Sequence, residues 1–469
     1  MRASHFDLVI LGSGSGNSLV TPEFEGKRVA VVEQGTFGGT CLNVGCIPTK
    51  MFVYAAEVAT SIREASRYGI DAMIDQVRWT DIRDRIFGRI DPISEAGRDY
   101  RLTGPTTAYL GRARFVGPRE LEITDLPGGE RARISGDQVV VATGSRPRVP
   151  DVVLDSGVDF HTSDTVMRID TLPASMVILG GGYIAAEFAH VFSALGVQVH
   201  IVNRGDRLLR AQDEQISAAF TEQARASWDV HLGVRAAALR TLAGGGVHLD
   251  LTDGTSIEAG LLLVATGRKP NTDDMGLDRA GIECHDDGRV IADEHGRTTA
   301  EGVWTLGDVS SPYQLKHVAN HEARVVAHNL AHPQDLRRVD HHAVPATVFT
   351  HPQLASVGMT EREAREAGHD VTVKVQPFGD TAYGWAMEDT TSICKLVADR
   401  DTAQLLGAHL MGPHSSSLIQ PLIQAMSSRR PVHDLAQSQY WIHPALAEVV
   451  ENALLGLDLP GPYDGAHVD

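Results

Sequence analysis

The chain has 469 residues, of which 42% are hydrophobic, and its formal net charge at pH 7 is −18. This length predicts about three domains, and the negative charge argues against binding to nucleic acid or to an acidic membrane surface. No apolar run reaches the roughly 18 residues of a membrane span, and we expect no signal peptide. Four cysteines are too few for a secreted disulfide scaffold, so we expect a cytoplasmic protein.

The first predicted element is a buried parallel strand that ends just before Gly12. Gly12 and Gly14 take the first and third places of a dinucleotide-binding fingerprint, whereas Asn17 stands at the sixth place with Gly16 beside it. This departure predicts looser packing on the strand but keeps the backbone approach to a pyrophosphate. The motif alone also fits an ordinary glycine-rich turn, but the next strand ends at Glu33, which is placed to hydrogen-bond a ribose.

The most distinctive stretch, residues 38–50, contains Cys41 and Cys46. In a regular helix, Cα atoms five residues apart are roughly 8.6 Å from each other, whereas disulfide-linked Cα atoms are about 4.4–6.8 Å apart. A Cys41–Cys46 disulfide therefore requires a distorted first turn, which Gly45 permits, and Pro48 suits the start of the regular helix beyond. A thiol at a helix N-terminus is partly ionised, which predicts a redox-active pair, and two unrelated buried thiols are the alternative.

The following elements are predicted from periodicity. Helices are expected at about residues 48–67 and 79–100, short strands between 108 and 137, and a buried strand over 139–145. Residues 146–150 are expected to form a hinge between domains.

A second fingerprint stands about 168 residues after the first, with glycine at Gly180 and Gly182 and the tolerated small residue Ala185. A repeated motif predicts two bound nucleotides. At the end of the next strand the ribose-binding acid is absent, and Arg204 and Arg210 follow instead. Arginine suits the 2′-phosphate of NADPH, and a solvated basic turn is the alternative.

The stretch Gly-Gly-Thr-Cys-x-Asn-x-Gly-Cys-x-Pro-x-Lys resembles the redox signature of the pyridine nucleotide–disulfide oxidoreductases, flavoproteins similar to glutathione reductase and dihydrolipoamide dehydrogenase. The resemblance covers nearly the whole chain. It implies an α/β fold with two doubly wound, Rossmann-like dinucleotide-binding domains and a C-terminal α+β dimerisation domain. The implied limits are 1–148 for the first part of the FAD-binding domain, 149–268 for the NADPH-binding domain, 269–343 for the return to the FAD or central domain, and 344–469 for the dimerisation domain.

The resemblance also implies a path for the electrons. Hydride would pass from NADPH to FAD and then to the Cys41–Cys46 disulfide, with Cys46 nearer the flavin and Cys41 attacking the substrate disulfide. Lys50 and Glu187 match the family's ion pair beside the flavin, where Lys50 would stabilise negative charge.

The resemblance further implies a homodimer whose active site is shared between the subunits. His443 lies in the family's His-Pro-x-x-x-Glu segment, which reaches the disulfide of the partner subunit. Glu448 would orient this histidine as the acid–base group. The remaining partner is a small-molecule disulfide substrate.

The residues expected to bind the cofactors lie in the two fingerprints, in the redox signature and at strand ends. They are Gly12, Gly14, Ser15, Gly16, Glu33, Thr40, Lys50, Thr143, Gly144, Asp308, Gly180, Gly182, Tyr183, Ile184, Glu187, Arg204, Arg210 and Gly267. No metal site is expected, because His317 and His321 are spaced i, i+4 but have no third ligand in view. Cys284 and Cys394 have no motif around them and are read as plain thiols.

Within the family, residues 12–17, 38–56 and 380–388 most resemble the mycothione reductases, which reduce the disulfide of mycothiol. A dihydrolipoamide dehydrogenase would carry an acid near Arg204, and a glutathione reductase would carry an early arginine near Thr21. We therefore expect an NADPH-dependent mycothione reductase. A glutathione reductase-like or dihydrolipoamide dehydrogenase-like enzyme, or a non-catalytic flavoprotein, is the alternative.

Overall fold

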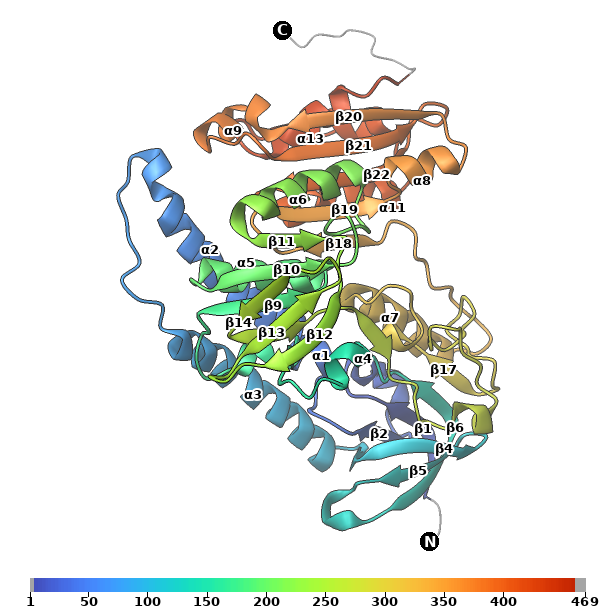
Figure 1. Ribbon diagram of the computed structural model, residues 1–469. Helices are drawn as coiled ribbons and strands as arrows, with labels where there is room; N and C mark the ends of the chain where they lie inside the picture. Colours follow the sequence, from blue (N-terminus) through green and yellow to red (C-terminus); the bar gives the residue numbers. More distant parts are fainter. Residues whose placement is uncertain (1–3, 460–469) are drawn as a thin grey trace. The chain divides into compact units, whose positions relative to one another are not determined.

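The computed structural model describes residues 4–459 (Figure 1). The chain divides into two compact units, each made of segments that are distant in the sequence. Unit 1 runs to Ala55 and continues with Asp75–Pro173 and Leu261–His341. Unit 2 comprises Ala56–Ile74, Ala174–Gly260 and the chain from His342 onward. The domain limits expected from the sequence stay predictions.

Unit 1 is built on a seven-stranded sheet. Its strands are β3 (Thr107–Leu110), β2 (Val29–Glu33), β1 (Ser4–Leu11), β6 (Ala132–Val141), β5 (Glu120–Thr124), β4 (Arg112–Gly117) and β17 (Val303–Thr305), which pairs with β6. The pairs β3–β2, β2–β1, β1–β6 and β6–β17 are parallel, whereas β5 and β4 continue antiparallel. The centre of β1, from Leu8 to Leu11, is fully buried, as expected for a parallel strand covered on both faces.

Unit 1 also contains helices and two short strand pairs outside this sheet. They are α1 (Gly39–Asn43), α2 (Cys46–Glu64, which continues into unit 2 after Ala55), α3 (Trp79–Thr103), α4 (Asp151–Leu154), α7 (Lys316–Ala331), the parallel pair β8 (His161–Thr162) and β15 (Leu261–Val264), and the antiparallel pair β7 (Ser145–Pro147) and β16 (Arg268–Pro270).

Unit 2 contains a parallel sheet of β9 (Ser175–Leu179), β10 (Gln198–Asn203) and β11 (Asp229–Leu232). Its helices are α5 (Tyr183–Ala194) and α6 (Glu214–Ser227). A three-stranded antiparallel sheet follows, made of β12 (Ala236–Thr241), β13 (Val247–Leu251) and β14 (Ser256–Ala259).

The C-terminal part of unit 2 is a five-stranded antiparallel sheet with helices. Its elements are β18 (Pro345–Val348), β19 (Gln353–Gly358), α8 (Glu361–Glu366), β20 (Val371–Pro377), α9 (Ala382–Ala386), β21 (Ile393–Asp399), β22 (Leu405–Gly412), α10 (Ser415–Leu418), α11 (Gln420–Ser427), α12 (Val432–Gln437) and α13 (Ala447–Leu455). A core that includes Leu396, Leu410, Leu422 and Val449 joins the sheet to these helices.

Most elements expected from periodicity are confirmed, and two expectations need correction. The buried strand expected over 139–145 ends at Val141. The packing after Gly12 is not loose, because Gly16 does the work of the missing third glycine. A Cβ on Gly16 would lie 2.9 Å from Ala142 Cβ and 3.0 Å from Ile10 Cγ2, whereas Asn17 accepts a 2.8 Å hydrogen bond from Arg101.

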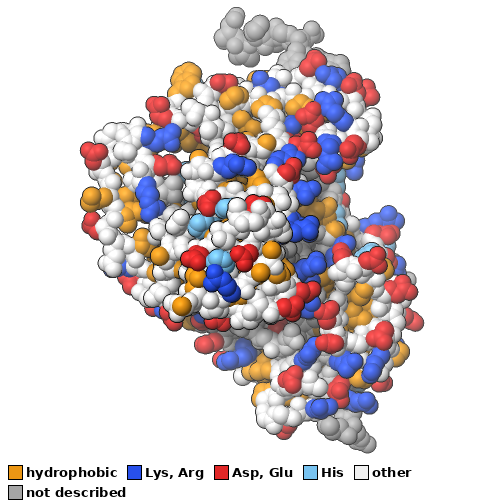
Figure 2. All heavy atoms as spheres, viewed as in Figure 1, with side chains coloured by type: hydrophobic (Ala, Val, Ile, Leu, Met, Phe, Trp, Pro, Cys, Tyr) orange, Lys and Arg blue, Asp and Glu red, His pale blue; other side chains and the backbone are white. Residues whose placement is uncertain are grey.

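The charged side chains are spread over the surface. Figure 2 shows Asp and Glu side chains interspersed with Lys and Arg over the face in view. The net charge of −18 is therefore not gathered into one acidic region on this face. Among residues 4–459, no helix combines the length and the apolar character that crossing a membrane requires.

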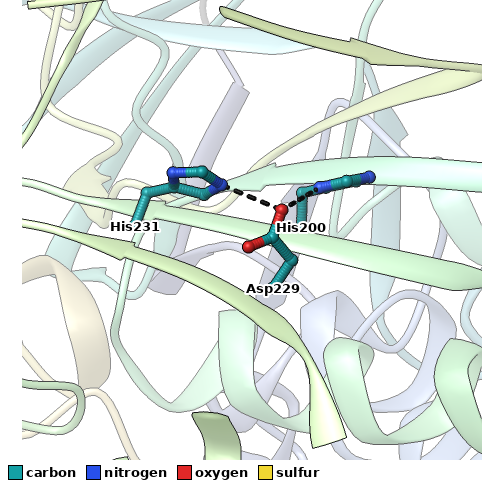
Figure 3. Close-up of side chains that lie close together, drawn as sticks. All are labelled: His200, Asp229 and His231. Carbon is teal, nitrogen blue, oxygen red and sulfur yellow. Dashed lines mark hydrogen bonds and ion pairs between the residues drawn. The ribbon is translucent and has the colours of Figure 1, made fainter. Parts of the chain in front are cut away.

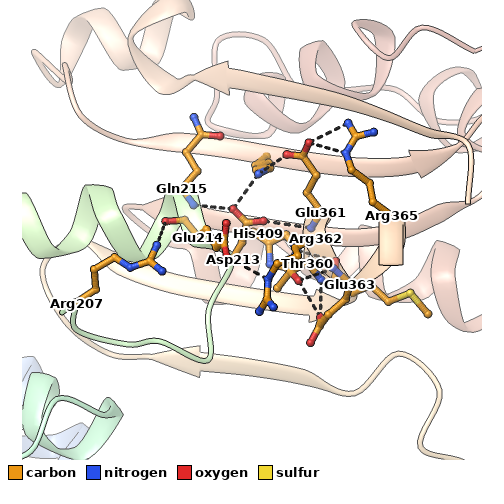
Figure 4. A network of polar contacts seen from close by, with 12 residues as sticks. Arg207, Asp213, Glu214, Gln215, Thr360, Glu361, Arg362, Glu363, Arg365 and His409 are labelled. Carbon is orange, nitrogen blue, oxygen red and sulfur yellow. Dashed lines mark hydrogen bonds and ion pairs between the residues drawn. The ribbon is translucent and has the colours of Figure 1, made fainter. Parts of the chain in front are cut away.

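Lys395 is a buried cation in unit 2. Lys395 of β21 lies 2.9 Å from Asp213, which caps α6, and 2.9 Å from Glu361 at the start of α8. Figure 4 labels both carboxylates, Asp213 and Glu361, within the surrounding network of polar contacts. Burial alone raises the pKa of the Asp213 carboxyl, but hydrogen bonds led by that from Lys395 keep it below its ordinary value. The Lys395 hydrogen bond likewise lowers the pKa of Glu361. Both carboxylates thus add stability that is complete above their ordinary pKa values and is lost as the pH falls through the lowered ones.

We predict that Lys395→Met lowers the free energy of unfolding by about 3–5 kcal/mol, because it leaves two carboxylates without their buried cation. Arg362→Met is the matched control, since Arg362 pairs with Glu214 and Glu366 on the same two helices but is exposed. Its loss should cost at most about 1 kcal/mol. Chemical denaturation of both variants checks this, and equal losses would contradict the role given to Lys395.

Candidate active site

The redox segment, residues 38–50, contains α1 and the start of α2, with a break between the two cysteines. Helix α1 ends with a hydrogen bond of 2.9 Å from Val44 N to Thr40 O, and the bond from Thr49 N to Gly45 O opens α2 at 3.0 Å. A Cβ on Gly45 would lie 2.9 Å from Thr40 O, so only glycine fits at the break. The distortion expected near Cys46 is thus present, and Gly45 permits it through close backbone approach.

The two thiols differ in acidity, because Cys46 donates a hydrogen bond to Cys41. Cys41 is half-buried and Cys46 is exposed, and both are free thiols. A hydrogen bond from Cys46 lowers the pKa of Cys41 to about 7 against the effect of burial, and the positive charge of Lys316 acts in the same direction. The pKa of Cys46 is raised, chiefly because its thiol donates that bond to Cys41. Cys41 is therefore the readier nucleophile of the pair.

The backbone of the first fingerprint is packed so closely that Gly12 has no room for a side chain. Gly12 has φ +108°, and a Cβ there would lie 2.3 Å from Ala142 O. Gly39, from the redox segment, has φ +69°, and its Cβ would lie 2.7 Å from Gly14 Cα. The nucleotide loop and the redox segment therefore touch backbone to backbone, a cradle that fits a dinucleotide approached by main-chain N–H groups.

Charged and polar side chains complete this part of unit 1. Glu33 Oε2 accepts hydrogen bonds of 2.9 Å from Ser13 N and 2.8 Å from Ser13 Oγ, so the acid lies against the glycine loop. Lys316 donates a 2.8 Å bond to Ser15 Oγ. Lys316 thus connects the fingerprint with the charge on Cys41.

Two Ala-Thr-Gly turns, at residues 142–144 and 265–267, are followed by side chains that form a hydrogen-bonded chain to Asp308. Ser145 Oγ donates a 2.6 Å hydrogen bond to Asp308 Oδ2, and Arg268 Nε donates a 2.8 Å bond to Ser145 Oγ. Thr143 Oγ1 donates to Asn271 O at 2.9 Å. Sequence reasoning missed Ser145 and Arg268, although each directly follows an Ala-Thr-Gly turn, because only the pairing of β7 with β16 brings them together.

The second fingerprint is folded against the loop after β10. Gly180 has φ +130°, and Gly182 caps the N-terminus of α5. A Cβ on Gly181 would lie 2.5 Å from the Asn203 side chain, whose amide donates a 2.9 Å hydrogen bond to Arg207 O. Asn203 thus holds the loop together.

The predicted arginines of this loop are open to solvent. Arg204 and Arg210 are both exposed, and a Cβ on Gly205 would lie 2.8 Å from Arg210 Cδ. Tyr183, at the start of α5, is also exposed. The N-terminus of α5 and the two arginines in the loop after β10 are groups that bind anionic ligands.

The predicted acid–base pair is formed within unit 2. His443 Nδ1 lies 2.6 Å from Glu448 Oε1 in the first turn of α13, and Glu448 Oε2 accepts a 3.3 Å bond from Ala445 N. This contact fixes Nδ1 as the donor and leaves Nε2 for proton transfer. The His443 side chain is 70% exposed. The pairing of Lys50 in unit 1 with Glu187 in unit 2 stays a prediction.

Comparison with known proteins agrees with this arrangement. The family profile "Pyridine nucleotide-disulphide oxidoreductase" matches residues 6–323, and the profile of the family's dimerisation domain matches residues 344–454. The chain belongs to the pyridine nucleotide–disulphide oxidoreductases. It is therefore an FAD-dependent disulfide reductase that uses NAD(P)H, and its dimerisation domain indicates a homodimer.

Individual relatives cover the oxidoreductase almost completely. It is 58% identical to a mycothione reductase from Mycobacterium tuberculosis over 464 residues, which cover 96% of this chain and 99% of the relative. It is 32% identical to a dihydrolipoyl dehydrogenase from Chlamydia muridarum, with 97% of each chain covered. The structure of LpdA from Mycobacterium tuberculosis superposes with a TM-score of 0.85 at 26% identity, covering 97% of this chain and 99% of LpdA. The expected fold class is thereby confirmed.

We predict that limiting iodoacetamide labels Cys41 before Cys46 in the reduced oxidoreductase, with a rate that rises through an inflection near the pKa of about 7. Cys46→Ala removes the hydrogen-bond donor and should move this inflection toward the ordinary thiol value of about 8.5. Mass spectrometry of the labelled peptides checks both points. Faster labelling of the exposed Cys46 would contradict the difference in acidity between the two thiols.

Proposed function

We propose that this oxidoreductase reduces mycothione, the disulfide of mycothiol, with electrons from NADPH. The observation that carries the proposal is the 58% identity to a mycothione reductase over 99% of that relative. The dihydrolipoyl dehydrogenase relative is only 32% identical over a similar span. The thiol pair in unit 1 and the His443–Glu448 pair in unit 2 supply the chemistry that such a reduction needs.

Cys41 is the proposed nucleophile toward the substrate. Bound FAD would supply the path by which an electron pair from NADPH reduces the Cys41–Cys46 disulfide. The Cys41 thiolate then attacks one sulfur of the substrate disulfide, so that a Cys41–substrate disulfide forms and the first mycothiol leaves with a proton. Cys46 attacks the Cys41 sulfur, passes its proton to the second mycothiol and closes the Cys41–Cys46 disulfide. Two electrons and two protons have then reached the substrate.

The preference for NADPH is proposed from Arg204 and Arg210. The end of β10 carries no acid that would accept hydrogen bonds from the hydroxyls of an NADH ribose, and Arg204 and Arg210 are both exposed in the loop that follows β10. Charge-assisted hydrogen bonds to a 2′-phosphate contribute about 1.5–3 kcal/mol each. One such bond therefore favours NADPH by roughly tenfold or more.

We also propose that His443 serves the cysteines of the partner subunit. His443 belongs to the dimerisation domain, and its neighbours Tyr440 and Ile442 are 102% and 74% exposed in the single chain. Two large exposed side chains so close together are typical of a surface that another chain covers. His443 held by Glu448 would then give its proton to the first leaving thiol.

The proposed substrate is tested with a panel of mycothiol, glutathione and lipoamide disulfides, each assayed with NADPH and with NADH. Mycothiol disulfide with NADPH should give the highest kcat/KM, because the chain is 58% identical to a mycothione reductase and carries Arg204 and Arg210 after β10. Cys41→Ser should abolish every activity in the panel. A glutathione disulfide efficiency equal to that for mycothiol disulfide would refute the substrate, and equal rates with NADH would refute the role of the arginines.

The shared site is tested by subunit exchange. His443→Ala should lower disulfide turnover by about 10²–10⁴-fold, the usual effect of losing a positioned acid–base group. When His443→Ala subunits are mixed with inactive Cys41→Ser subunits, each heterodimer should contain one complete site. At random exchange, the mixture should recover roughly a quarter of the wild-type activity.

The matched control for this exchange is a mixture of Cys41→Ser and Cys46→Ser subunits. Both changes fall in the same half of the site, so their heterodimers contain no complete site and should stay inactive. If the His443→Ala mixture also fails to recover although exchange is demonstrated by mass spectrometry, His443 does not act across the interface.

A further inference from the structure

Three side chains of the types that commonly bind metal ions meet at the edge of the parallel sheet of unit 2. They are His200 on β10 and Asp229 and His231 on β11, and their ligand atoms all lie within 4.8 Å of one another. His200 Nδ1 is 2.8 Å and His231 Nε2 is 3.0 Å from the same oxygen, Asp229 Oδ2. Figure 3 shows both imidazole rings directed at this one carboxylate.

Strand pairing explains why the three side chains share one side of the sheet. His200 is the register partner of Asp229 across the parallel β10–β11 pair. His231 stands two residues after Asp229, and side chains two residues apart in a strand point to the same face. The three side chains therefore project from paired strands, and β11 is the edge strand beside β10.

We propose that His200, Asp229 and His231 form a binding site for a divalent transition-metal ion, with Zn²⁺ as the ion of choice. Two imidazoles and one carboxylate are donors that Zn²⁺ commonly takes, and water can complete the tetrahedron. Ligand atoms at the usual Zn²⁺ distances are roughly 3.3–3.6 Å apart. The N–O distances of 2.8 and 3.0 Å need only a small outward movement to reach this spacing.

The local charge and exposure favour a cation. Asp229 brings one negative charge, and Asp253 in the turn between β13 and β14 lies within electrostatic reach of His231. His200 and His231 are mostly covered, with 12% and 24% of their side chains exposed, whereas Asp229 is 53% exposed. An ion can therefore enter past Asp229 and be held by imidazoles that are already fixed in place.

An ion in this site would fix the edge strand β11 next to the loop that follows β10 and carries Arg204. His200 lies three residues before Asn203 along β10, and beyond β11 the chain donates from Gly233 N to Gly205 O at 2.9 Å and from Val234 N to Asn203 O at 3.3 Å. The metal is thus placed to hold the strand that supports the loop of Arg204.

The test measures Zn²⁺ bound to the oxidised FAD-loaded enzyme, in which Cys41 and Cys46 are joined and are not ligands. Cys284→Ser serves as the background, because Cys284 is an exposed thiol. Calorimetry and metal analysis after dialysis should give one Zn²⁺ per subunit. His231→Gln and Asp229→Asn should each weaken binding by at least about 10–100-fold, the effect already produced by losing a residue that only supports a ligand.

His248→Gln is the matched control. Its ring also contacts two carboxylates, Asp250 and Glu258 at 3.0 Å each, on the neighbouring antiparallel sheet, but within residues 4–459 it belongs to no group of three metal-ligand side chains. Zn²⁺ binding should be unchanged in this variant. Absence of Zn²⁺ binding by the parent enzyme, or equal binding by all variants, would overturn the proposal.

A measurement on the unsubstituted enzyme guards against variants that fail to fold. Zn²⁺ should protect His200 and His231 from diethyl pyrocarbonate, as read by mass spectrometry, and should leave the modification of His248 unchanged. Equal modification of His231 with and without Zn²⁺ would overturn the proposal. Reductase activity plays no part in either readout, so the metal site and the proposed substrate stand or fall separately.

Discussion

The contact between Gly14 and Gly39 is the constraint on which the arrangement of unit 1 depends. Two loops from different parts of the chain touch there with main-chain atoms, and a Cβ on Gly39 would be 2.7 Å from Gly14 Cα. The nucleotide loop can then present its N–H groups while the redox segment lies directly beside it.

The electrostatics of the thiol pair follow from the same placement. Lys316 reaches the nucleotide loop through Ser15, and its charge favours the Cys41 thiolate. Cys46 keeps the proton because its thiol donates to Cys41. The break at Gly45 makes this possible, since an unbroken helix would hold the two sulfurs on different turns. A substrate disulfide would thus be attacked by the Cys41 sulfur, and the Cys46 sulfur could then re-form the Cys41–Cys46 disulfide.

Unit 2 uses charge in a different way. Lys395 neutralises two carboxylates inside the protein and connects α6, α8 and β21. The acid–base pair of His443 and Glu448 is instead open to solvent at its histidine end. The difference is physical: a buried ion pair fixes packing because separating its charges is costly, whereas a group that transfers protons to a substrate must keep one face free.

The sequence by itself determined the family, the fold class and the identity of the chemical groups. Glycine spacing, strand ends and the thirteen-residue redox signature are local patterns, and their chemistry depends on residue types a few positions apart. Helices α2 and α3 were predictable for the same reason, since their periodicity lies within one segment.

Only the tertiary structure decided which distant groups meet. Gly16 replaces the third fingerprint glycine because Ala142, far along the chain, packs against it. Ser145 joins Arg268 and Asp308 through the pairing of β7 with β16, and His200 meets Asp229 and His231 through the register of β10 with β11. Such contacts depend on strand register and loop closure, and these are set by the packing of the whole unit, which no local pattern in the sequence encodes.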